Sequence, residues 1–104
     1  VAPRPGEAVR LYFFEPRYQI LIRRAWEGSR HFLCTPSKPA KGATGLMVLV
    51  ERAVFESDGK AHIQGRGVEL VTLQRVWVEE GTSGLYCAEV DETKAPVEIE
   101  AGFP

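Results

Sequence analysis

The residues best suited to nucleophilic chemistry are two cysteines, Cys34 and Cys87, and two histidines, His31 and His62. Catalysis by a cysteine requires a nearby base that removes the thiol proton. His31 and Cys34 are three positions apart in a stretch that favours a strand, so their side chains are expected on opposite faces. His62 alternates with polar residues after a predicted turn, which indicates exposure to solvent. We therefore predict no catalytic residue.

The sequence also lacks the patterns of metal and cofactor sites. The cysteines are far apart and form no Cys-x-x-Cys pair, so no zinc site is expected. Gly65-Arg66-Gly67 fits neither G-x-G-x-x-G nor G-x-x-x-x-G-K-[ST], the glycine patterns that surround phosphate groups. We predict no metal and no cofactor. Both cysteines are expected to be buried free thiols, which favours a reducing intracellular compartment, either the cytoplasm or an organellar matrix.

The composition is that of one globular domain. The chain has 104 residues, of which 44% are hydrophobic and 26% are charged. Its longest apolar run, Leu46–Val50, is far shorter than the ~20 residues of a membrane helix, so no membrane association is expected. The net charge of −1 combines a basic first half with an acidic second half. The chain therefore lacks the dominant basic excess of a general nucleic-acid binder.

Strands are expected to dominate the fold. Apolar and alternating stretches predict strands over residues 8–14, 31–35, 46–55, 61–66, 68–79 and 85–90. Asp58-Gly59 is a typical hairpin turn, and Gly65 and Gly67 indicate a bulge or a sharp bend. A polar loop of residues 36–45, rich in proline and glycine, is of a kind that often takes part in binding.

One helix is predicted over residues 16–27. Pro16 suits the first turn of a helix, and Gly28 is a natural stop. Four apolar side chains at helical spacing would form its buried face: Tyr18, Leu21, Ile22 and Ala25. Together with the strands, this helix predicts a small, strongly bent barrel of α+β type.

Because no catalytic site is expected, we consider recognition through the surface. Candidate partner-binding residues are Trp26, Met47 and Trp77, since large apolar side chains anchor interfaces when they are exposed. Core packing is the alternative for each of them. Met47 adjoins the 36–45 loop, so it could instead contribute to a hydrophobic groove there.

A longer motif adds a resemblance. The motif is Phe14-Glu15-Pro16-Arg17-Tyr18, and it follows Pro5-Gly6-Glu7 and a short apolar strand. This arrangement resembles the N-terminal (LON) domain of the ATP-dependent protease La (Lon) family. The same module is found in cereblon-like and RING-finger Lon-domain proteins. The resemblance covers about residues 3–92 and includes the Asp58-Gly59 hairpin and Tyr86–Val90.

The resemblance implies an α+β, mainly β fold: a PUA-like pseudo-barrel of about six mostly antiparallel strands, with the helix packed at its side. It implies a non-catalytic domain that binds polypeptide substrates or partner proteins, through apolar side chains near the 36–45 loop and on the sheet surface. The longer protein would be an ATP-dependent serine protease or a ubiquitin-ligase component. The motif is expected to be mainly structural, with Arg17 paired to a carboxylate or to strand-end carbonyls and Tyr18 in the core.

Two departures from the family pattern are expected. Residues 1–92 would form the domain without its usual first strand, and residues 93–104 would be an exit segment containing at most a short edge strand. An unpaired sheet edge could then recruit a second copy, which makes a structural oligomerisation domain one alternative function. The other is an RNA-binding module, since PUA-like barrels are also used on RNA. The basic residues that it would use are Arg17, Arg23, Arg24, Arg30, Lys38 and Lys41.

Overall fold

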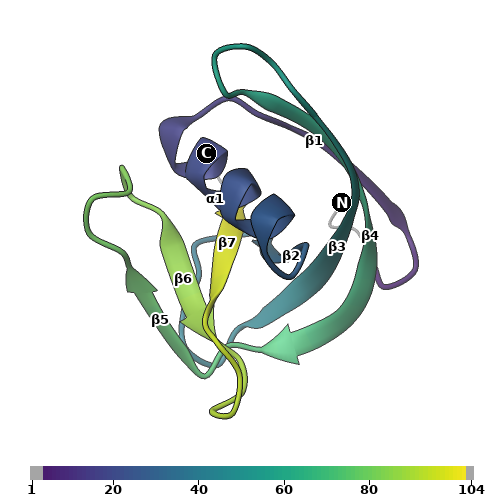
Figure 1. Ribbon diagram of the computed structural model, residues 1–104. Helices are drawn as coiled ribbons and strands as arrows, with labels where there is room; N and C mark the ends of the chain where they lie inside the picture. Colours follow the sequence, from purple (N-terminus) through teal and green to yellow (C-terminus); the bar gives the residue numbers. More distant parts are fainter. Residues whose placement is uncertain (1–3, 103–104) are drawn as a thin grey trace.

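A computed structural model describes residues 4–102, which form one sheet and one helix (Figure 1). In chain order the elements are β1 (Ala8–Phe13), α1 (Pro16–Glu27), β2 (His31–Thr35), β3 (Thr44–Phe55), β4 (Ala61–Thr72), β5 (Arg75–Val78), β6 (Tyr86–Glu89) and β7 (Val97–Ala101). No helix in this part of the chain is long and apolar enough to span a membrane.

The seven strands form a single mixed sheet in the order β1-β4-β3-β2-β7-β6-β5. Neighbouring strands are antiparallel, except that β2 and β7 run parallel. The sheet curves around α1 without closing, so β1 and β5 are its two edges (Figure 1). This architecture confirms the predicted α+β, mainly β class, with seven strands rather than about six.

The curvature of the sheet depends on two glycines in β4. A Cβ atom on Gly65 would lie 2.6 Å from the carbonyl oxygen of Leu49, and one on Gly67 would lie 2.6 Å from that of Arg4. The pairing of β3 with β4 shifts register near both glycines. The predicted bulge is therefore confirmed, because only a residue without a side chain permits this close approach. The strand continues through the bulge to Thr72 instead of breaking at Gly67.

The helix has the predicted bounds and buries the predicted face. It begins at Pro16 and ends at Glu27, with Gly28 at its C-terminal cap. Its buried side chains are Tyr18, Leu21, Ile22 and Ala25. These pack with inward-facing residues of β1, β2, β3 and β4 in the larger of two hydrophobic clusters. The smaller cluster, centred on Leu33, Ala88 and Ile99, lies on the opposite face of the sheet.

The C-terminal segment differs from the prediction of an exit segment with at most an edge strand. β7 lies inside the sheet, between β2 and β6, and Ile99 and Ala101 are buried. The alternation of Val97, Ile99 and Ala101 with two glutamates made a strand visible in the sequence. Its position was not visible, because the neighbours of β7 are set by contacts with strands far away in the chain.

Side chains of α1 attach the helix to β7 and to Glu79, the residue that follows β5. The hydroxyl group of Tyr18 donates a hydrogen bond to the carbonyl oxygen of Ala101 and accepts one from the Ala101 N–H, each at 3.2 Å. Arg24 forms ion pairs with Glu79, at 2.6 Å, and with Glu98, at 3.4 Å. These contacts fix the helix across one end of the curved sheet and leave a hollow beside it.

Candidate functional site

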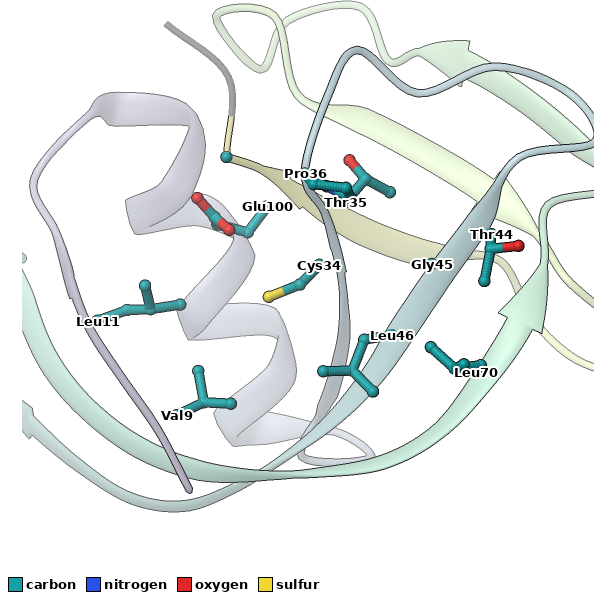
Figure 2. Close-up of a pocket in the computed structure, with 11 residues that line it drawn as sticks. Val9, Leu11, Cys34, Thr35, Pro36, Thr44, Gly45, Leu46, Leu70 and Glu100 are labelled. Atoms are coloured by element: carbon teal, nitrogen blue, oxygen red, sulfur yellow. The ribbon is translucent and has the colours of Figure 1, made fainter. Parts of the chain in front are cut away.

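The hollow, which we call the concave groove, has a volume of about 460 Å³ and lies inside the curve of the sheet (Figure 2). Five strands that follow one another in the sheet contribute to it: β1, β4, β3, β2 and β7. Its lining residues are Val9, Leu11, Cys34, Thr35, Pro36, Thr44, Gly45, Leu46, Leu70, Glu100 and Gly102. The groove adjoins both ends of the 36–45 loop, near which the sequence predicted binding.

The walls of the groove are mainly apolar. Val9 and Leu11 of β1 lie on one side, across the open space from Cys34 and Leu46 (Figure 2). Leu46 and Leu70 are register partners in β3 and β4, so their side chains share this face. Leu70 is 59% exposed, the highest value among the large hydrophobic residues described. An apolar hollow with such a rim is typical of a binding site rather than of a packing defect.

Two ionisable side chains line the groove, Cys34 and Glu100. They are register partners across the parallel pair β2 and β7, and the Glu100 carboxylate lies close enough to the Cys34 thiol to act on its pKa. Burial, reinforced by this carboxylate, raises the pKa of Cys34 far above its ordinary value of 9.0. The thiol is therefore protonated at neutral pH and is a poor nucleophile.

Glu100 is a half-buried acid in apolar surroundings. Desolvation raises the pKa of its carboxyl group above the ordinary value of 4.5, while the thiol of Cys34 and the positive charge of Arg17 oppose this rise. Arg17 itself pairs with Glu15 at 3.4 Å, and its guanidinium lies 4.5 Å from the centre of the Tyr18 ring. Among residues 4–102, no lysine or arginine lies within ion-pair distance of Glu100.

The motif residues surround the start of α1. Glu15 caps the helix through its backbone, Pro16 occupies the first turn and Tyr18 is buried. Arg17 pairs with a carboxylate, that of Glu15. Phe14 is exposed, and its ring centre lies 5.9 Å from that of Tyr12. The motif thus builds the junction of β1 with α1, and none of its residues lines the groove.

The three candidate partner-binding residues lie in different places. Trp26 is half-buried at the end of α1, where the guanidinium of Arg30 lies 3.6 Å from the centre of its ring. Trp77 is half-buried on β5 and packs against the larger cluster. Met47 packs against the smaller cluster on the other face of the sheet. Trp26, like Trp77, packs against the larger cluster, whereas Met47 is on the other face, so the three do not share one surface. None of them lines the groove.

The residues of the groove escaped the sequence analysis for a common reason. Val9, Leu11 and Leu46 look like ordinary inward-facing strand residues, and only the fold shows that they face a hollow. Only Glu100 gave a weak indication of the site, because it is an acidic residue within an alternating apolar strand. Its partner strand, however, could not be read from the sequence.

The histidines and cysteines do not assemble into a catalytic site. The His31 ring contacts the carbonyl oxygen of Ser29 at 2.8 Å, and His62 stacks on Tyr12 with 4.4 Å between ring centres. Cys34 and Cys87 are free thiols. Within the described residues, no three His, Cys, Asp or Glu side chains are grouped so as to hold a metal ion.

Comparison with solved structures defines the class of protein: the chain has the fold of a Lon N-terminal domain. A particular relative is the Lon N-terminal domain protein from Xanthomonas campestris, with a TM-score of 0.68 and 29% sequence identity. The match covers 86% of this chain and 52% of the relative, so the chain spans about half the length of that protein. No family model matches the sequence. No curated protein matches it either.

Proposed function

We propose that this domain binds extended polypeptide segments in the concave groove and catalyses no reaction itself. The groove is the observation that carries the proposal: it is mainly apolar, lies inside the curve of the sheet and has an exposed leucine, Leu70, at its rim. The Lon N-terminal fold supports the same function, that of a substrate-binding or partner-binding domain of a larger protein acting inside the cell. Burial and the neighbouring Glu100 carboxylate raise the pKa of the Cys34 thiol, which supports a role without chemistry.

An extended polypeptide fits the groove better than RNA does. β1 carries Val9 and Leu11 into the groove and pairs only with β4 among the described strands, so its other backbone edge is available to a further strand. A peptide lying along β1 would gain main-chain hydrogen bonds from this edge and place alternate side chains against the apolar walls. RNA would require basic groups for its phosphates, and the lining residues include none.

The test uses a fluorescent polypeptide that is kept unfolded by reduction and carboxymethylation. Its binding to the chain is measured by fluorescence anisotropy. We expect saturable binding to the wild-type chain and a loss of about tenfold in affinity for Leu70→Ser, because the rim would lose apolar contact area. Val54→Ser is the matched control, since Val54 is 50% exposed but lies outside the groove. Equal losses in both variants, or no binding to the wild-type chain, would contradict the proposal.

A further inference from the structure

We propose that the concave groove selects polypeptide segments that carry a lysine or arginine, whose cationic end pairs with the carboxylate of Glu100. This inference rests on the proposed function, because it names the kind of segment that the same groove binds. The observation behind this inference is the position of one acidic side chain, Glu100, among the apolar walls of the groove.

The charges around Glu100 leave its carboxylate without a cationic partner. The groups that face it are Cys34 on β2 and, from the start of α1, Arg17 and Glu15. Cys34 is a neutral hydrogen-bond donor. Arg17 lies close enough to act on Glu100 through its charge, but its ion pair is with Glu15. The site is therefore short of one positive charge, which a bound segment can supply.

The walls of the groove suit the rest of a basic side chain. Lysine and arginine have long apolar stems that pack on hydrophobic surfaces while the charged end reaches a polar partner. Here Val9, Leu11 and Leu46 provide the apolar surface, and Glu100 provides the polar partner. Water is partly excluded from this carboxylate, so a hydrogen-bonded cation stabilises it more than it would a carboxylate on the open surface.

Glu98 provides an internal comparison. It precedes Glu100 by two positions on β7 and so points to the same face of the sheet. Its carboxylate, however, is already paired with Arg24 at 3.4 Å and does not line the groove. Of these two neighbouring acids, only Glu100 is placed to receive a cation from a ligand.

The experiment compares short acetylated and amidated peptides of alternating serine and leucine, with lysine, norleucine or glutamate at the central position. Affinities for the wild-type chain, Glu100→Gln and the control Glu98→Gln are measured by titration calorimetry. We expect the lysine peptide to bind the wild-type chain and Glu98→Gln about tenfold more tightly than the norleucine peptide does. In Glu100→Gln this preference should disappear, so that the lysine and norleucine peptides bind with similar affinity.

Each other outcome has a distinct meaning. If all three peptides bind the wild-type chain equally well, the selection of basic segments is refuted while polypeptide binding stands. If Glu98→Gln loses the preference and Glu100→Gln keeps it, the assignment to Glu100 is wrong. If no peptide binds, the proposed function itself fails, and this inference fails with it. The comparison of the three peptides on the wild-type chain decides the question of selectivity without any variant.

Discussion

Cys34 and Glu100 are neighbours across the parallel pair of strands β2 and β7, and both line the concave groove. Burial raises the pKa of both groups, and the Glu100 carboxylate raises the pKa of Cys34 further, whereas the Cys34 thiol opposes the rise in the pKa of Glu100. The Cys34 thiol is therefore protonated at neutral pH, and the Glu100 carboxylate beside it is half-buried. Because a protonated thiol is a poor nucleophile, we expect this pair to take part in binding rather than in nucleophilic attack.

Thiol reactivity tests this description of the cysteines. Burial raises the pKa of Cys87 to about 12, and that of Cys34 still further. Because the thiolate is the reactive form, we expect both thiols of the native chain to react with iodoacetamide at pH 8 about a hundredfold or more slowly than in the unfolded chain. Mass spectrometry of timed samples gives the two rates. Rapid modification of Cys34 in the folded chain would contradict the described burial.

The dependence of stability on pH tests Glu100. A carboxyl group whose pKa is raised on folding binds its proton more tightly in the native state, so it lowers the free energy of unfolding as pH rises above its ordinary value of 4.5. Replacing it with glutamine removes this loss. We therefore expect Glu100→Gln to gain stability relative to the wild-type chain between pH 4 and pH 7, by about 1 kcal/mol.

Urea unfolding of both chains across this pH range measures the effect. The control is Glu98→Gln, which loses an ion pair with Arg24 instead and should not gain stability as pH rises. A stability difference between Glu100→Gln and the wild-type chain that is independent of pH would show that the carboxyl group has no raised pKa.

The attachment of α1 to β7 is tested by Tyr18→Phe. This change removes one hydroxyl group, which leaves the N–H and the carbonyl group of Ala101 without their partner. We expect a loss of about 1–3 kcal/mol in the free energy of unfolding. Tyr12→Phe is the control, because the hydrogen bond that it removes, to Glu56, lies on the surface. Its loss in the free energy of unfolding should stay below about 0.5 kcal/mol. Similar losses in the two variants would contradict the structural role given to Tyr18.

The curvature of the sheet is tested by two glycine-to-alanine changes. In Gly65→Ala the new Cβ atom would meet the backbone oxygen of Leu49, which cannot move without disturbing the pairing of β3 with β4. We expect a loss of about 1–3 kcal/mol in unfolding free energy. Gly45→Ala is the matched control, because its Cβ atom would make ordinary contacts of 3.5 Å with Leu73 and Thr35. Chemical denaturation measures the free energy of unfolding of both variants. A larger loss for Gly45→Ala than for Gly65→Ala would contradict this role of Gly65.

The features that the sequence predicted correctly are those determined by residues close together in the chain. Pro16 and Gly28 mark the ends of α1, and Gly65 and Gly67 mark the bulge, because each acts through its own backbone. The position of β7 was not predictable in this way, since it depends on pairing with β2, more than sixty residues earlier in the chain. The groove was hidden for the same reason: it joins Val9, Leu46 and Glu100 from three distant segments.

The most direct test of polypeptide binding in the groove is a titration of the ¹⁵N-labelled chain with the alternating serine-leucine peptide that has a central lysine, followed by amide chemical shifts. We predict saturable shifts concentrated along β1 and at Cys34, Leu46, Leu70 and Glu100, with little change at Trp77 and Met47. Shifts that cluster away from the groove, or none at millimolar peptide, would contradict the account.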